Sequence, residues 1–478
     1  MAKTNSKRDL TNGPLFVPMI QFVIPIILTG MLQIVYNMAD NIVVGQYSGD
    51  NLALAAVGST SSLSNLIVNL LMGIAGGAGV VIAQSYGAKA FERLAKAVHT
   101  SMTFSIIGGV AFCLIGLLIS APALSIMGTK DELMSRAVLY MQIICLGIPA
   151  TAVYNFGAAV LRSVGDSKTP LIILSSTGVI NVLLNLFFVI VCKISISGVA
   201  LATIIAQYIS AATVVYILIK RTGESYALNV KQLHIDKDTL KEILRLGLPA
   251  GFQGTLFSIS NIILTSGINQ LPTADISGKT IAINIESLVH TSMNSYLHAA
   301  MTFTGQNYGA KKPERIKKSI IYAVIQVFLI GFIGGQIVNL FARPLAGLYI
   351  DPADPNKDAV MAAALELMQF MLSVYFLCGI MDTLSGALRG LGYSNIPMIV
   401  SIGAICVLRA IWVFFVFPTE KFHSLIGIYT IYPISWSLGV IAMVIALLIL
   451  YPRVKKKLIP EVKDELYEQE ELEPCDEE

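Results

Sequence analysis

Twelve long apolar segments run through this 478-residue chain and constrain its fold more than any other feature. A helix of about 20 apolar residues crosses the hydrocarbon core of a bilayer. A soluble protein could not bury this much apolar surface, because 55% of the residues are hydrophobic and only 13% are charged. The sequence therefore predicts an all-α membrane protein. The expected transmembrane helices lie near residues 15–44, 52–82, 97–120, 137–161, 170–191, 195–219, 243–269, 281–304, 318–341, 361–388, 396–417 and 425–451.

Basic residues are concentrated on one side of these spans. If the N-terminus is cytosolic, 25 of the 33 Lys and Arg residues fall in cytosolic segments and 7 on the opposite side, and only Arg409 lies deep within a span. The positive-inside rule then places both termini in the cytosol, as an even number of spans requires. We expect a multi-pass protein of the cell (cytoplasmic) membrane.

Two stretches of the chain occur twice. Residues 84–96 (QSYGAKAFERLAK) and 306–318 (QNYGAKKPERIKK) are identical at eight of thirteen positions, and residues 161–170 match 388–397 at five of ten. Dividing the twelve expected spans between the two repeats gives six helices in each half. Because six is even, the halves point the same way and form two parallel repeats, a design typical of transporters that move two halves about a central site.

The repeats also divide the chain into domains. The longest polar stretch between spans separates the two six-helix bundles, and the last eighteen residues hold ten acids. The expected parts are a cytosolic N-terminus (1–14), an N-terminal bundle (15–219), a cytosolic linker (220–242), a C-terminal bundle (243–452) and an acidic cytosolic tail (453–478). Gly87 and Gly309 should end helices, and the Lys/Arg cluster after each should face anionic headgroups.

Four acids fall inside predicted spans: Asp40, Glu286, Glu366 and Asp382. A carboxylate at mid-bilayer costs about 2.5–3.5 kcal/mol, so it normally faces a cavity or a partner. Neutralising the group removes much of that cost, which suits it to bind and release H⁺ or Na⁺. Glu366 is expected near the outer interface, where water can reach it.

The first-half acid has polar companions. Gln33, Tyr36, Asn37 and Asp40 share one helix face, since they are three or four residues apart. Asn181 and Asn185 in the fifth span and Thr203 in the sixth could complete an oxygen cage around a small hard cation. The alternative is a buried Asp40 that is hydrogen-bonded only for packing.

The eighth span carries a second polar stripe, at intervals of four residues: Glu286, His290, Asn294 and His298. A Glu one turn before a His is a candidate proton relay, because His titrates near neutrality. The stripe could equally attract a cationic substrate or hold helices together. Asp382 is a weaker candidate for substrate binding or relay, and Arg409 needs a buried anion that Asp382 or Glu286 could supply.

Several functional classes find no support in the sequence. No phosphate-binding GxxxxGK[ST] loop, GxSxG motif or metal-spaced Cys/His cluster occurs. We therefore expect no enzyme, no cofactor beyond H⁺ or Na⁺ as coupling ion, and no nucleic-acid partner. The expected partners are small organic substrates and the lipid bilayer, and the expected state is a monomer. A receptor or channel is disfavoured by the tandem halves.

The motifs resemble the multidrug and toxic compound extrusion (MATE) family of bacterial efflux transporters. The residues that carry this resemblance are Met38–Gln46 (MADNIVVGQ), Ala83–Lys89, Leu161–Pro170, Asn181–Asn185, Ile285–Met293, Gly305–Lys318 and Gly386–Pro397. The resemblance implies a V-shaped antiporter of twelve helices that exports cationic, often aromatic compounds in exchange for Na⁺ or H⁺. The second possibility is a lipid-linked oligosaccharide or lipid flippase of the same superfamily, but such a protein should line its cavity with cations.

The resemblance also assigns residues. The family's first-helix acid falls on Asp40, and its cation site falls on Asn181, Asn185 and Thr203. Many members have Asp where this chain has Asn185, so H⁺ coupling or a weaker Na⁺ site is implied. A seventh-helix Glu of other members would lie near Phe257, and Glu286 resembles the acid of another branch that could replace it.

Overall fold

The computed structural model describes residues 10–47, 53–351 and 355–459, and within these ranges all regular structure is helical. Twelve spans follow one another as predicted, although their ends differ from the expected ones by several residues. They are α1 (Phe16–Tyr47), α2 (Ala53–Gly87), α3 (Phe91–Ile126), α4 (Asp131–Ser163), α5 with η1 (Lys168–Leu186, Phe187–Val191), α6 (Ser195–Lys220), α7 (Lys237–Ile268), α8 (Thr273–Gly309), α9 (Pro313–Leu340), α11 with α12 (Lys357–Val374, Phe376–Gly390), α13 to η4 (Asn395–Ser401, Ile402–Val407, Leu408–Ile411, Trp412–Val416) and α16 (Ile431–Leu458).

The later spans are the less regular ones. α11 and α12 meet at an angle of 43° and together form the tenth span. The eleventh span alternates between α-helical and π-helical turns. Short helices α10 (Ala342–Gly347) and α15 (Leu425–Tyr429) connect spans, and η2 (Val230–Gln232) lies in the linker. Of the described helices, nine are long and apolar enough to cross a bilayer, and the bent pair makes a tenth. The remaining two spans, α7 and α8, carry more polar residues.

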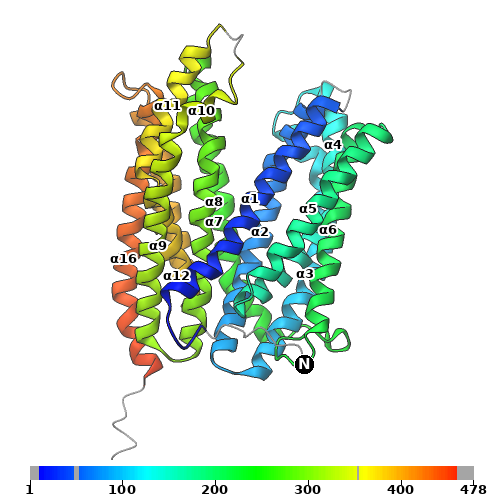
Figure 1. The fold of residues 1–478 in the computed structure, drawn as a ribbon, viewed down its shortest axis with the longest axis vertical. Helices are drawn as coiled ribbons and strands as arrows, with labels where there is room; N and C mark the ends of the chain where they lie inside the picture. Colours follow the sequence, from blue (N-terminus) through cyan, green and yellow to red (C-terminus); the bar gives the residue numbers. More distant parts are fainter. Residues whose placement is uncertain (1–9, 48–52, 352–354, 460–478) are drawn as a thin grey trace, which may run out of the picture.

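The spans form two lobes, one containing α1 to α6 and the other α7 to α16 (Figure 1). The lobes lie close together at one end and diverge toward the other. The first and last described residues lie at the close end. This arrangement confirms the predicted twelve-helix, V-shaped fold.

The first helix of each lobe begins in the core of the other lobe. Met19 and Phe22 of α1 belong to the apolar core of the second lobe, where the Phe22 ring meets the Phe303 ring edge-on at 5.8 Å. Conversely, Ile243 and Leu246 of α7 lie in the core of the first lobe. Both helices contain an internal proline, Pro25 and Pro249. The lobes are therefore joined through these two crossing helices at the close end.

The duplicated QxYGAK segments hold the lobes together. Gln84 Nε2 on α2 donates to the Gly390 carbonyl of α12 at 2.9 Å, and Gln306 Nε2 on α8 donates to the Ser163 carbonyl of α4 at 2.7 Å. Gly87 ends α2, and a Cβ there would overlap the Gln306 carbonyl. We call the two glutamine hydrogen bonds the inter-lobe clasp.

The basic residues after the clasp also make protein contacts. Arg93 forms an ion pair with Glu242 at the start of α7, at 2.7 Å. Its counterpart in the second repeat, Arg315, donates to the Gly13 carbonyl just before α1 at 2.9 Å. Beside the expected role at lipid headgroups, each cluster thus contains an arginine that contacts the start of the other half's first helix or the segment just before it.

Candidate functional site

The first lobe brings together the acid and the amides that were predicted as one site. The Asn185 amide nitrogen donates to Asp40 Oδ1, and it also approaches Asn181 Oδ1 at 3.4 Å. Asn181 Nδ2 lies 3.5 Å from Thr203 Oγ1, which donates to the Val199 carbonyl. A chain of polar groups thus runs from α1 through α5 to α6. The Oδ1 of Asn185 is buried and has no hydrogen-bond partner among the described residues.

The other polar residues of α1 do not join this chain. Tyr36 packs its ring against Gly178 of α5 and donates its hydroxyl to the Ser175 carbonyl at 3.1 Å. Gln33 and Asn37 are exposed. The predicted stripe therefore divides. Tyr36 and Asp40 contact α5, whereas the amides of Gln33 and Asn37 do not take part in the polar chain around Asp40.

The second lobe contains a cavity of about 440 Å³ that reaches Glu286. Glu286 is 3% exposed, and its Oε1 has no hydrogen-bond partner among the described residues. Lys279, His290 and Arg409 line the same cavity, as does Phe257. Glu286 on α8 thus lines the same cavity as Phe257 on α7, which is the position where the resemblance would place a glutamate.

Arg409 is not ion-paired in the described part of the chain. Its guanidinium lies 4.1 Å from the centre of the Tyr432 ring and 3.4 Å from Asn261 Oδ1. The expected partners, Asp382 and Glu286, do not form a salt bridge with it. The aromatic ring and the amide satisfy part of its charge instead, which sequence spacing could not show because these groups lie on other helices.

Aromatic rings line one wall of this cavity. Tyr375 stacks on Trp436 with ring centres 5.4 Å apart, and Tyr432 meets Trp436 edge-on at 5.2 Å. Aromatic walls bind flat apolar molecules through large contact areas and ring stacking. The cavity thus combines an acid, two cations and a rigid aromatic surface.

The polar stripe of α8 reaches three different surroundings. Glu286 and His290 line the cavity, Asn294 Nδ2 donates to Asp382 Oδ2 at 3.2 Å, and His298 lies where the lobes meet. The His290 ring stacks at 6.0 Å on Tyr375. No hydrogen bond joins Glu286 to His290 among the described residues, so a relay between them needs an intervening water.

One group of side chains could hold a metal ion. Ligand atoms of His290, Cys378 and Asp382 all lie within 4.8 Å of one another. Nitrogen, sulfur and carboxylate ligands suit a tetrahedral ion such as Zn²⁺ with one position left open. The sequence shows no metal-binding motif at these residues, because α8 and α12 contribute them from positions about ninety residues apart.

Two further arginines lie at the lobe junction. Arg162 lies in the last turn of α4 and Arg389 in the last turn of α12, and both are half-buried. Arg389 Nη2 donates to Gln253 Oε1 at 2.7 Å. Both residues lie beyond the predicted span ends at 161 and 388, because both helices continue into the repeated motif. The sequence feature that could have identified these arginines is the repeat of residues 161–170 at 388–397, where Arg162 and Arg389 occupy equivalent positions.

Comparison with known families agrees with the duplication. The MatE family model matches residues 25–187 and again residues 249–415, once in each half. The chain belongs to the MatE family. The first match includes Asp40 and Asn185, and the second includes Glu286 and Arg409.

Three curated relatives come from bacteria. The probable multidrug resistance protein YoeA of Bacillus subtilis is 28% identical and covers 88% of this chain and 90% of its own length. The probable multidrug resistance protein NorM of Thermotoga maritima is 27% identical over 82% of this chain and 83% of its own. MepA, a multidrug export protein of Staphylococcus aureus, is 22% identical over 83% and 86%. This MATE protein therefore belongs among multidrug efflux transporters, which are transport proteins and not enzymes.

Solved MATE structures show the same fold. An outward-facing multidrug resistance transporter superposes with a TM-score of 0.86 at 22% identity, covering 95% of this chain and all of the other. A MATE structure in the bent conformation superposes at 0.84 with 22% identity, over 95% of this chain and 100% of the other. One in the straight conformation superposes at 0.82 with 23% identity, over 95% and 99%. The match to the V-shaped fold of twelve helices thus extends over almost the whole chain.

Proposed function

We propose that this protein is a secondary exporter that carries organic compounds out of the cell in exchange for H⁺ or Na⁺. The observation that carries the proposal is that each lobe holds a carboxylic acid within its membrane helices, Asp40 in one lobe and Glu286 in the other. The protein is expected to work as a monomer without a cofactor, with both termini in the cytosol. The flippase is not proposed, because the curated relatives bear the names of multidrug resistance proteins.

The geometry around Asp40 favours H⁺ over Na⁺. The amide nitrogen of Asn185 lies between the oxygens of Asp40 and Asn181, which is the place a small cation would occupy. Na⁺ would require the amide to turn over and present its oxygen. A proton requires no such change, since it binds to the carboxylate itself.

The acid of the second lobe supports the same proposal. Glu286 lines the cavity, yet one of its oxygens has no partner among the described residues. A charged carboxylate in such a place is costly, and binding an ion removes much of the cost. Binding of the ion therefore favours a conformation in which the acid is shielded from water. Release of the ion favours a conformation in which water reaches the acid.

The mechanism follows from this difference between loaded and unloaded acids. With the lobes apart on the outside, Asp40 takes up the ion, and the substrate loses an attractive negative charge and leaves. The lobes then rock about the crossing helices α1 and α7, and the ion leaves to the cytosol. Each state is preferred by one ligand, as alternating access requires.

Efflux from proteoliposomes under one imposed gradient at a time tests the proposal. Tetramethylrhodamine methyl ester, a fluorescent organic cation, is the substrate probe. We expect efflux under a pH gradient. Efflux under a Na⁺ gradient alone would assign Na⁺ as the ion, and no efflux of this or any other organic cation under either gradient would refute the exporter.

The Asp40→Asn variant tests the acid itself. We expect it to lose gradient-driven efflux while it remains monodisperse after purification, because the amide cannot exchange a proton. The matched control is Glu366→Gln, which neutralises an exposed acid on α11 and should leave efflux unchanged. Full transport by Asp40→Asn would exclude this acid from coupling.

A further inference from the structure

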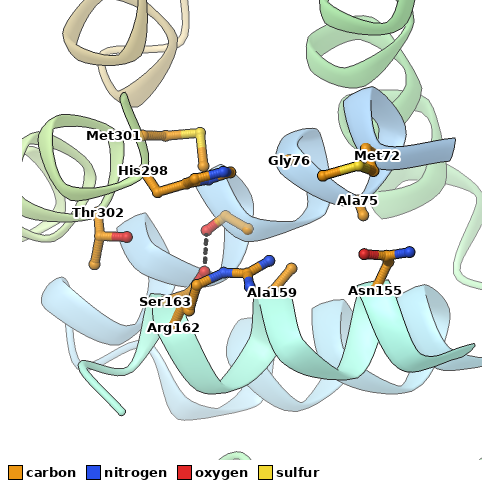
Figure 2. Close-up of a pocket in the computed structure, with 11 residues that line it drawn as sticks. Met72, Ala75, Gly76, Asn155, Ala159, Arg162, Ser163, His298, Met301 and Thr302 are labelled. Carbon is orange, nitrogen blue, oxygen red and sulfur yellow. Dashed lines mark hydrogen bonds between the residues drawn. The ribbon is translucent and has the colours of Figure 1, made fainter. Parts of the chain in front are cut away.

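A small cavity lies where the lobes meet, between α2 and α4 of the first lobe and α8 of the second (Figure 2). Its volume is about 20 Å³. Arg162 and Asn155 of α4 and His298 and Thr302 of α8 bring nitrogen and oxygen atoms to it. A space of this size holds about one water-sized group, such as an oxygen atom at the end of a larger molecule, and not the body of a drug.

The two basic groups in this cavity have no partner in the described part of the chain. No hydrogen bond or ion pair engages the Arg162 guanidinium or the His298 imidazole there. Two donors beside them are already used: Ser163 Oγ donates to the Gly79 carbonyl at 2.8 Å, and Asn155 Nδ2 donates to the Thr151 carbonyl at 2.9 Å. A half-buried guanidinium without a counter-charge is costly, and an anion would compensate it.

The internal duplication shows what Arg162 lacks. The equivalent arginine in the second repeat, Arg389, donates to Gln253 and lies two helical turns after an acid, Asp382, on the same helix face. The residue equivalent to Asp382 in the first repeat is Asn155, which carries no charge. The first repeat therefore has the arginine without the acid.

We propose that this cavity binds the anionic oxygen group of an exported compound. A guanidinium binds a carboxylate or phosphate oxygen pair through two parallel hydrogen bonds, and an imidazole N–H and a threonine hydroxyl add donors from the other lobe. The substrates then include amphiphiles that carry a carboxylate, zwitterions among them. This inference rests on the proposed export function and narrows its substrate class.

Methionine side chains beside the cavity could contact the apolar part of such a molecule. Met72 lines the cavity and is 44% exposed, so the cavity is bordered there by a flexible apolar side chain that solvent or substrate can reach. Met301 adds a second thioether side chain from α8. Methionines adapt to apolar bodies of different shape. The anionic group would be held at Arg162, and the apolar body would lie past Met72.

A matched pair of dyes tests the proposal. Tetramethylrhodamine carries a free carboxylate, and its methyl ester has the same rings and no negative charge. Binding of each dye to the purified full-length protein in phosphatidylcholine nanodiscs is measured by fluorescence anisotropy. We expect Arg162→Gln to weaken binding of the acid by about tenfold or more and that of the ester by less than about threefold.

Two further variants keep the test decisive if Arg162→Gln folds poorly. Asn155→Asp supplies the acid that the second repeat has, and it should weaken the acid dye selectively while Arg162 stays in place. Arg343→Gln removes an exposed arginine of α10 and should change neither dye. Equal effects of Arg162→Gln and Asn155→Asp on both dyes, or no effect on either, would overturn the proposal.

The remaining outcomes separate this proposal from its alternatives. If the discrimination disappears in nanodiscs that contain phosphatidylglycerol, a lipid headgroup occupies the cavity and the substrate assignment is wrong. If the wild type exports the ester under a gradient but never binds the acid, the exporter stands and the anion site falls. If binding of the acid depends on Arg162 but no organic dye is exported under either gradient, the anion site stands and the exporter falls.

Discussion

The inter-lobe clasp should decide how firmly the lobes stay together at the close end. Replacing Gln84 and Gln306 by Met keeps the length and volume of each side chain and removes both donors. The Gly390 and Ser163 carbonyls, which accept these hydrogen bonds at 2.9 and 2.7 Å, then lose their inter-lobe partners. We expect the double variant to populate conformations in which the lobes separate at this end.

The size of the effect follows from the burial of each group. Loss of a buried hydrogen bond that leaves its acceptor unpaired costs about 1–3 kcal/mol, which applies to Gln84. The Oε1 of Gln306 is buried without a partner in the described part of the chain, so Met also removes one unsatisfied atom, and its cost is near the lower end, about 1 kcal/mol. The sum of about 2–4 kcal/mol corresponds to a roughly thirtyfold to thousandfold shift between the two conformations.

Spin labels across the close end can measure this shift. Lys168→Cys at the start of α5 and Lys317→Cys in the first turns of α9 are exposed positions on opposite lobes. With the native cysteines replaced, pulsed electron resonance gives the distribution of distances between the two labels. The clasp variant should gain a population at longer distances.

The control for this experiment is Gln369→Met, which changes an exposed glutamine of α11 and should leave the distribution as in the wild type. A clasp variant with unchanged distances and unchanged transport rate would refute the reasoning. It would mean that helix packing alone, without the two hydrogen bonds, holds the lobes together at this end.

Three other variants test separate parts of the structure. Asn185→Asp adds a second carboxylate beside Asp40 and should create Na⁺-driven efflux, measured in proteoliposomes; continued dependence on the pH gradient alone would argue against the oxygen cage. Gly73→Ala places a Cβ on the backbone of α7 and should cost about 1–3 kcal/mol of stability, seen as a lower melting temperature, whereas Gly334→Ala meets open space and should cost little. Glu286→Leu should raise or preserve the melting temperature, because it removes a buried oxygen that no described residue pairs with, and should abolish transport; a normal transport rate would exclude Glu286 from coupling.

Much of the fold could be predicted because membrane spans and repeats are local signals. Apolar length marks each span, and the duplicated motifs mark the two halves. The breaks within the later spans could not be predicted, since the bend between α11 and α12 and the π-helical turns of η3 and η4 depend on neighbouring helices. The same limit applies to the exchange of α1 and α7 between the lobe cores.

The candidate site divides in the same way. Spacing correctly grouped residues of one helix, such as Asn181 with Asn185, because residues four apart share a helix face. It could not pair Arg409 with Tyr432 or gather His290, Cys378 and Asp382, since these contacts join helices that are distant in the sequence.

By itself, the sequence determined that the chain crosses a membrane twelve times in two similar halves and carries isolated acids within its spans. Apolar length, charge asymmetry and repetition are properties of the chain that do not depend on packing. Only the tertiary structure decided that the repeated motifs fasten one half to the other, and that Arg162 lies between the lobes without a partner among the described residues. The reason is physical: a contact between distant helices depends on how both helices pack, and no local pattern records that.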